Sequence, residues 1–307
     1  MSENPLTPIK TLRIRPWGQV ARDLELILDA LVERGVRVDD NSRLRRYIRY
    51  MREEGASFDA SERLERMSEI RSDAEEIVTA VEHLVAPPEV HGWERLFRLV
   101  QRGPLFAAPR EDPGRDAQVE LLMGSLLRST NADVFFRGAD AEARYRGHVI
   151  SFAAKRARSL KNLGKLVKDG RNQLTRAGGT GVLFLDLTQL APEHAGVRTV
   201  ASYDDAMKEL APPLFETLER LREHVPRWIR GSGTIASNVL ASIGFVKVRF
   251  VMPGPNGEDH GIIRRYLASQ ATETPVPEWL RDFVNEFARI GEAPPQHRYE
   301  PVPLVIS

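Results

Sequence analysis

Two carboxylates and one lysine occur close together near the middle of the chain, at Asp140, Glu142 and Lys155. Residues two apart in a β-strand share one face, so Asp140 and Glu142 would lie side by side on a strand. Carboxylate oxygens are preferred ligands of Mg²⁺, and a neighbouring ammonium stabilises negative charge that develops during a reaction. These residue types and spacings indicate metal-assisted chemistry at an anionic group such as a phosphate.

Whether these side chains meet depends on the register of two short strands. If Arg146-Gly147 forms a two-residue hairpin loop, Tyr145 pairs with His148 and the numbers of paired residues sum to 293. Asp140 then lies opposite Ala153 and Glu142 opposite Ser151, on the same face as Lys155. A loop longer by one residue would place Asp140 and Lys155 on opposite faces.

The surrounding elements could position this pair. A helix from Asp116 to about Leu127 and a short strand from Ala132 to Phe136 precede it, and an apolar strand from Gly181 to Asp186 follows. Residues 137–176 contain eleven Lys or Arg and three acids, a local charge of +8 in a chain of net charge +1. In the basic helix of this stretch, Lys161, Lys165 and Lys168 form one stripe that could neutralise backbone phosphates; the alternative is a solvated helix face.

These motifs resemble the PD-(D/E)XK nuclease superfamily over about residues 116–188, roughly a quarter of the chain. Glu120 matches the glutamate of the superfamily's first helix, and Asp140 matches its strand aspartate. The stretch from Phe152 to Arg156 matches the acid-x-Lys strand, and Gln173 stands where many members carry a glutamine. The sequence departs from the pattern at Ala153, where the superfamily usually has Asp or Glu, and Glu142 could supply the displaced carboxylate.

The resemblance implies a restriction-endonuclease-like α/β domain with a mixed sheet. It also implies cleavage of DNA with Mg²⁺ or Mn²⁺, in a setting of restriction, repair or anti-phage defence. Glu120, Asp140 and Glu142 would be metal ligands, Lys155 would stabilise charge and Gln173 would complete the catalytic set. DNA contacts are expected from five basic residues: Arg156, Arg158, Lys161, Lys165 and Lys168. The alternative from another class is a catalytically degenerate nuclease-fold module that binds nucleic acid or assembles a complex.

Each residue also has a purely structural interpretation. Glu120 could lie at the solvent edge of its helix, and Asp140 and Glu142 could be polar positions of an edge strand. Lys155 and Arg156 could begin a solvated helix, and Gln173 could simply lie on the surface. Asp133 is a rival to Asp140, but its strand comes early relative to Lys155.

The domain organisation is expected to be a helical domain over residues 1–107 and the nuclease-like domain over 108–307, because residues 102–115 break the helical periodicity with three prolines and two glycines. The helical part could recognise a partner protein, form a homo-oligomer or restrain the nuclease. Arginines over residues 43–52 could contact nucleic acid, although a solvated face is the alternative.

Composition narrows the class of protein. The chain has 307 residues, 42% of them hydrophobic and 28% charged, as is typical of a globular protein. The absence of cysteine excludes disulfides and thiolate metal sites and favours a cytoplasmic location. The first fifteen residues do not resemble a signal peptide, and no apolar run is long enough to cross a bilayer, so no membrane partner is expected.

Overall fold

The fold is a mixed α/β architecture built on one sheet. The computed structural model describes residues 9–14, 17–33, 35–53, 60–84, 92–107, 112–130, 132–138, 140–225, 238–254, 257–270 and 276–289. The sheet has eight strands, in the order β1-β8-β7-β5-β4-β3-β2, with β6 paired to β7 off this path. Its strands are β1 (Ile9–Ile14), β2 (Asp133–Phe135), β3 (Ala141–Tyr145), β4 (His148–Arg156), β5 (Thr180–Asp186), β6 (Val197–Thr199), β7 (Val239–Gly254) and β8 (Gly257–Gln270).

Parallel pairing is confined to the middle of the sheet. β4 pairs with β5 and β5 with β7 in parallel, β6 also runs parallel to β7, and the other pairs are antiparallel. A parallel pair needs a crossover connection, which α6 supplies between β4 and β5. The α-helices are α1 (Trp17–Glu33), α2 (Arg43–Glu53), α3 (Ala60–Leu84), α4 (Trp93–Val100), α5 (Pro113–Arg128), α6 (Leu160–Ala177), α7 (Tyr203–Arg222) and α9 (Glu278–Arg289). Two short 3₁₀ turns are Thr188–Leu190 and Pro192–His194.

The hairpin between β3 and β4 has the register that the sequence predicts. Arg146 and Gly147 both have positive φ, 47° and 83°, as a tight two-residue turn between twisted strands requires. Tyr145 pairs with His148 and Glu142 with Ser151. Asp140 and Lys155 therefore project from the same face of the sheet.

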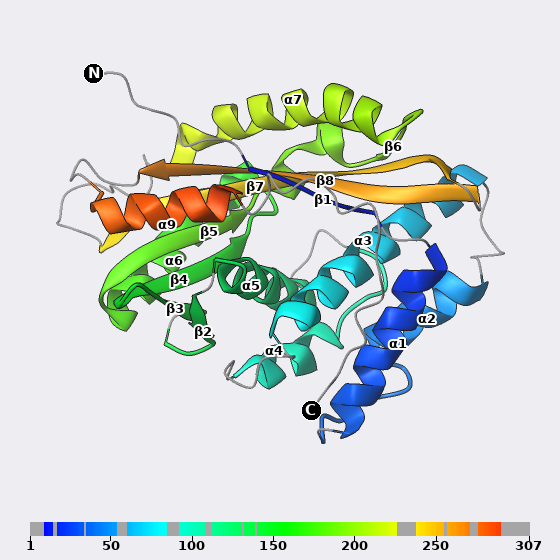
Figure 1. Cartoon of the computed structure of the whole chain (residues 1–307), viewed down its shortest axis with the longest axis horizontal. Helices are drawn as coiled ribbons and strands as arrows, with labels where there is room; N and C mark the ends of the chain where they lie inside the picture. The colour runs from blue at the N-terminus through cyan, green and yellow to red at the C-terminus, as the bar shows by residue number, and fades with distance from the viewer. Residues whose placement is uncertain are drawn as a thin grey trace.

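Helices cover both faces of the sheet, and each face has its own buried cluster (Figure 1). On one face, α6 and α7 pack on Ala153 of β4 and on Leu183 and Leu185 of β5. On the other face, α1 to α5 and α9 pack against Phe152, Ala154 and Phe184. Successive strand residues point to opposite faces, so β4 and β5 contribute alternately to both clusters.

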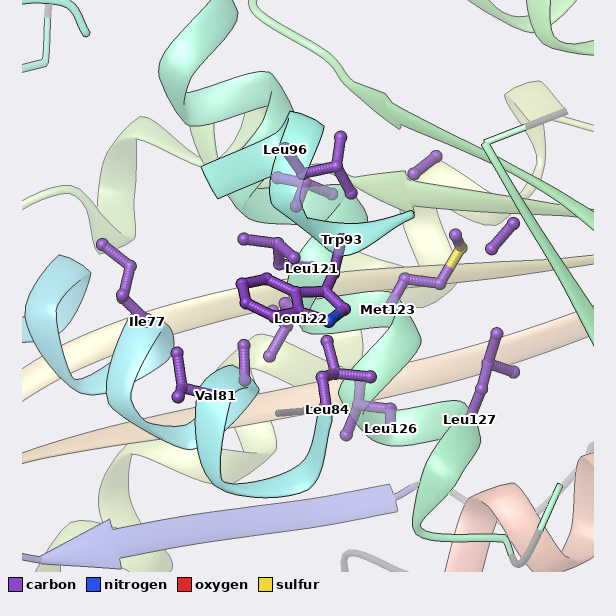
Figure 2. Close-up of a cluster of buried hydrophobic side chains, with 14 of the residues drawn as sticks. Ile77, Val81, Leu84, Trp93, Leu96, Leu121, Leu122, Met123, Leu126 and Leu127 are labelled. Carbon is purple, nitrogen blue, oxygen red and sulfur yellow. The ribbon is translucent and has the colours of Figure 1, made fainter. Parts of the chain in front are cut away.

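The first five helices share their core with the sheet. Figure 2 shows Trp93 of α4 enclosed by apolar side chains of α3 and α5, among them Val81, Leu84 and Leu122. The same cluster continues to β3, β4, β5, β7, β8 and α9. In addition β1, which belongs to the first 107 residues, pairs with β8. The two predicted domains thus share one core. The domain boundary between residues 107 and 108 stays a prediction.

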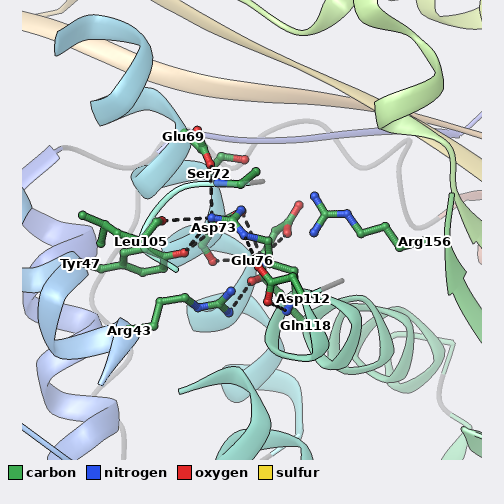
Figure 3. A network of polar contacts seen from close by, with 12 residues as sticks. Arg43, Tyr47, Glu69, Ser72, Asp73, Glu76, Leu105, Asp112, Gln118 and Arg156 are labelled. Carbon is green, nitrogen blue, oxygen red and sulfur yellow. Dashed lines mark hydrogen bonds and ion pairs between the residues drawn. The ribbon is translucent and has the colours of Figure 1, made fainter. Parts of the chain in front are cut away.

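A network of buried charges joins these helices to the strands (Figure 3). Glu76 of α3 accepts hydrogen bonds from Lys247 Nζ of β7 at 2.6 Å, Arg264 Nη2 of β8 at 2.8 Å and Gln118 Nε2 of α5 at 2.6 Å. Burial alone would raise the pKa of Glu76, but the charges of Lys247 and Arg264 outweigh it and lower the pKa to about 2. Glu76 is therefore ionised inside the molecule.

Asp73, one turn earlier on α3, extends this network toward the other helices. It forms an ion pair with Arg115 of α5 and accepts a hydrogen bond from the Tyr47 hydroxyl of α2 at 2.9 Å. Burial would raise the pKa of Asp73, yet Arg115, Lys247 and Arg43 together hold it below its usual range. Ionic contacts from one helix thus reach α2, α5, β7 and β8.

The local predictions are confirmed in part. The predicted short strand near 132–136 is present as β2. The helix predicted to start at Asp116 begins earlier, at Pro113, and its N-cap is Asp112, whose Oδ1 accepts a hydrogen bond from Arg115 N at 3.1 Å. Helix α7 runs unbroken past Pro212 and Pro213. The N-terminal strand β1 was not expected, because one isolated run such as Ile9–Ile14 becomes a strand only when β8 offers it an edge.

None of the helices in the described part of the chain is long and apolar enough to cross a membrane.

We predict that Glu76→Gln lowers the free energy of unfolding by about 3–5 kcal/mol, because it leaves Lys247 and Arg264 buried beside a neutral group. Since the fold depresses the pKa of Glu76, its contribution is complete above about pH 4.5 and is lost as the pH falls toward 2. Urea denaturation at pH 7 and pH 3 measures both effects. The control is Glu62→Gln on the same helix, whose half-exposed pair with Arg66 is worth less than about 1 kcal/mol. Equal losses for the two variants would contradict the prediction.

Candidate active site

Four of the predicted residues come together, from three layers of the structure. Asp140 lies just before β3, Lys155 lies near the end of β4, Gln173 comes from α6 and Glu120 comes from α5. Lys155 is part of a strand, so the alternative that it begins a solvated helix is wrong. The helices lie on opposite faces of the sheet, so the site forms where both layers reach the same strands.

The Asp140 carboxylate is the centre of the cluster. Its Oδ2 accepts hydrogen bonds from the Ala154 backbone N–H at 2.8 Å and from Lys155 Nζ at 3.0 Å. Its Oδ1 accepts a hydrogen bond from Gln173 Nε2. Asp140 N donates to the Phe152 carbonyl at 3.0 Å, which fixes the backbone that carries the carboxylate. Both oxygens are thus oriented by neighbours on β4 and α6.

The Lys155 ammonium has three acceptors. Besides Asp140 Oδ2, it donates to Gln173 Oε1 at 2.8 Å and to the Ala154 carbonyl at 3.0 Å. An ammonium has three protons, so these contacts use its full donor capacity. Gln173 forms hydrogen bonds with both Asp140 and Lys155 and thereby orients the pair, and its role in catalysis stays a prediction.

Glu120 lies beside this pair with an incompletely satisfied carboxyl. Among the described residues its buried Oε2 has no hydrogen-bond partner, and Arg95 Nη2 lies 3.8 Å from it. Burial, and next the negative charge of Asp140, raise the pKa of Glu120 to about 8, although Lys155 and Arg95 oppose the shift. A buried carboxyl that faces a second carboxylate and lacks a donor is a position where a cation would be stabilised.

Glu142 is not joined to the other three. It shares a face with Asp140, as predicted, but its Oε2 accepts from Arg137 Nε at 2.8 Å, and its Oε1 lies against Gly138. Within the described residues, no three Asp, Glu, His or Cys side chains are gathered as ligands for one metal ion. The predicted trio of Glu120, Asp140 and Glu142 is therefore represented by two neighbouring carboxyls, with the third held by an arginine.

Ala153 is fully buried beneath α6. A Cβ built on Gly170 of α6 would lie 3.7 Å from the Ala153 Cβ and 2.5 Å from Leu183 Cδ1. The helix backbone thus approaches β4 and β5 closely at this point. A small residue at 153 fits this contact, and a longer acidic side chain there would have to displace the helix.

The five predicted DNA-contacting residues fall into two groups. Arg156 lies near Asp186, with Nε and Oδ2 3.6 Å apart, and Arg158 Nη2 donates to both oxygens of Asp116 at 2.8 Å. Both arginines are thus engaged inside the protein. The remaining three are exposed on α6, as a phosphate-binding stripe requires: Lys161, Lys165 and Lys168.

The arginines of α2 are also occupied. Arg43 is buried and donates to Gln118, whereas Arg45 and Arg52 pair with acids of α1, and Arg46 and Arg49 donate to backbone carbonyls. These contacts favour a structural role for the cluster over nucleic-acid binding. Asp133, the rival of Asp140, is half-exposed and pairs with Arg128, away from Lys155.

Sequence reasoning missed the partners of the site residues. Arg95, Arg137 and Asp116 come from α4, the turn before β3 and α5, and spacing along the chain does not link them to Glu120, Glu142 and Arg158. The ion-pair partner of a residue is set by tertiary packing. The sequence therefore shows whether a residue is acidic or basic, but not which residue it will pair with.

Comparison with known proteins adds no relative: no family model, no curated protein and no solved structure matches this chain.

We predict that Glu120→Gln removes a pH dependence of stability. Because the pKa of Glu120 is raised from 4.5 to about 8 in the folded state, the fold favours the protonated form, and this contribution is lost as the pH rises through 8. In metal-free buffer with a chelator, the variant should gain stability over the wild type at pH 9 and match it at pH 4. Denaturation midpoints at the two pH values measure this difference. The exposed Glu216→Gln is the control, and an equal gain at both pH values would contradict the prediction.

Proposed function

We propose that the chain is a divalent-metal-dependent endonuclease of the PD-(D/E)XK type that hydrolyses phosphodiester bonds of DNA. The observation that carries the proposal is the meeting of Asp140, Lys155 and Gln173 with the buried Glu120 carboxyl. These residues come from a helix, a strand start, the next strand and a following helix, in the order that the resemblance implies. The restriction-endonuclease-like fold of this domain is part of the same proposal.

Although only two carboxyl groups come together at the site, they are enough to hold a divalent cation. Mg²⁺ is commonly held by one or two carboxylates together with water and substrate phosphate oxygens, and does not need a complete protein cage. Glu120 and Asp140 supply two carboxyl groups, and Glu120 Oε2 accepts no hydrogen bond from the described residues. Mg²⁺ or Mn²⁺ bound there would polarise the scissile phosphate and lower the pKa of a water molecule.

The protein's own groups would orient and stabilise the reacting phosphate. The Ala154 N–H and Gln173 hold Asp140 in one orientation. Lys155 would exchange one of its three acceptors for a phosphate oxygen and so offset the charge that develops there. The exposed lysines of α6 would neutralise neighbouring backbone phosphates.

A second function is favoured by two specific observations. The Lys155 ammonium is saturated by protein acceptors, and Ala153 leaves the superfamily's usual acid position apolar. A cluster of this kind can serve as an internal ion pair that fixes the fold, in a module that binds nucleic acid or a partner protein without cutting it. The cleavage assay below separates the two functions.

We predict metal-dependent cleavage of plasmid DNA by the wild type, and a rate at least about a hundredfold lower for Lys155→Ala and Asp140→Asn. The assay follows conversion of supercoiled DNA in Mg²⁺, Mn²⁺ or chelator. In parallel, saturating Mn²⁺ should stabilise the wild type against urea by about 2–3 kcal/mol at a concentration near a hundred times its Kd. Asp140→Asn should lose this stabilisation.

The matched control for Lys155 is the exposed Lys208→Ala, which should cleave at the wild-type rate. Metal-independent cleavage, or equal rates for wild type and Lys155→Ala, would rule out the proposed site. Absence of both cleavage and Mn²⁺ stabilisation would favour the non-catalytic module.

We further predict that Glu142→Gln reduces cleavage less than tenfold, whereas Glu120→Gln reduces it about a hundredfold, because Glu142 is paired with Arg137 and Glu120 faces Asp140. Initial rates at saturating Mg²⁺ measure this difference. If Glu142→Gln is the more damaging change, Glu142 must leave Arg137 during the reaction and supply the third carboxylate.

A further inference from the structure

We infer that Arg95 of α4 is a substrate-binding residue that contacts a DNA phosphate at the mouth of the site. This inference rests on the proposed function and adds to it a residue that lies outside the nuclease-like motifs. It also assigns a binding role to the N-terminal helices, from which α4 comes.

Arg95 lies close to Glu120, and its side chain is exposed to solvent. Its Nη2 is 3.8 Å from Glu120 Oε2, so the two side chains are close together but are beyond hydrogen-bond distance. The Arg95 side chain is 67% exposed, whereas that of Glu120 is 17% exposed. The guanidinium therefore stands on the solvent side of the buried carboxyl, where an incoming anion would meet it.

The backbone that carries Arg95 is fixed. Trp93, Leu96 and Phe97 are buried in the cluster with α3 and α5, part of which Figure 2 shows. The helix follows Gly92, which has a φ of 88°, and a Cβ at this residue would lie 2.6 Å from the Phe136 carbonyl oxygen. A helix anchored by buried apolar residues thus holds an exposed cationic side chain beside the site.

When a divalent cation occupies the site, electrostatic forces favour contact between Arg95 and a DNA phosphate. A divalent cation held by Glu120 and Asp140 would repel the Arg95 guanidinium, which would then no longer favour the vicinity of Glu120. The nearest anion available to Arg95 is then a phosphate of the bound strand, which a guanidinium can bind through two parallel hydrogen bonds. Exposed cations would in this way face the DNA from both layers, Arg95 from α4 and the lysine stripe from α6.

Arg98 provides a matched control on the same helix. It is exposed, as Arg95 is, and lies three residues later. No ion pair with Glu120 is found for Arg98 among the described residues. Arg98→Ala changes the net charge of α4 by the same amount as Arg95→Ala, so long-range charge effects cancel in the comparison.

The test measures two affinities for each variant. Binding of a short fluorescein-labelled duplex is followed by anisotropy in Mg²⁺, in a Lys155→Ala background that prevents cleavage. We expect Arg95→Ala to weaken binding about fivefold and to reduce the slope of log affinity against log salt by about 0.9, Arg95→Lys to restore part of the loss, and Arg98→Ala to have no effect. Mn²⁺ binding without DNA, measured by calorimetry on the same proteins, should be unchanged or tighter for Arg95→Ala, because a competing cation has been removed.

The outcomes distinguish this inference from the proposed function. If the wild type binds Mn²⁺ and cleaves DNA but Arg95→Ala binds DNA as tightly as Arg98→Ala does, the role of Arg95 is overturned and the nuclease stands. A parallel loss of Mn²⁺ and DNA affinity in Arg95→Ala would show that Arg95 supports the structure of the site, and would also overturn the role. If the wild type neither binds Mn²⁺ nor cleaves DNA, both proposals fall together.

Discussion

An ionised glutamate inside the protein, Glu76, determines how the helices sit on the sheet. Its carboxylate is shared by a lysine of β7, an arginine of β8 and a glutamine of α5, so one group joins three elements distant in sequence. A buried charge is tolerated only when its partners are in place, so this arrangement disfavours any other docking of α3. The placement of α4 and α5, and with them Arg95 and Glu120, follows from that docking through the apolar cluster around Trp93.

The residues of the candidate site come from elements on both faces of the sheet. The hairpin and α6 bring Asp140, Lys155 and Gln173 together by local connections, within about thirty-five residues of chain. Glu120 joins them from the opposite layer, and its raised pKa expresses first the cost of burying its carboxyl and second the negative charge of Asp140. Such a cost is commonly found where a ligand binds, because the ligand removes it.

The sequence predicts those parts of the arrangement that depend on residues close together in the chain. It does not predict the contacts between segments that are distant in the chain. The register of β3 and β4 follows from a two-residue turn, so the common face of Asp140 and Lys155 was predictable and is confirmed. The stripe of exposed lysines on α6 likewise follows from helical periodicity. By contrast, the pairing of Glu142 with Arg137, of Arg158 with Asp116 and of Glu76 with β7 and β8 depends on which surfaces meet. Neither side-chain type nor spacing encodes those choices, and for the same reason strand β1 was not expected.

The close contact at Gly170 also has a mechanical consequence. Because the α6 backbone rests directly on Ala153 and Leu183, the distance between Gln173 and Lys155 could change only if α6 moved relative to β4. Glu120 belongs to the other layer, so a small slide of the helices across the sheet would alter its separation from Asp140 alone. The distance between the Glu120 and Asp140 carboxyls would then change when strain displaces the N-terminal helices.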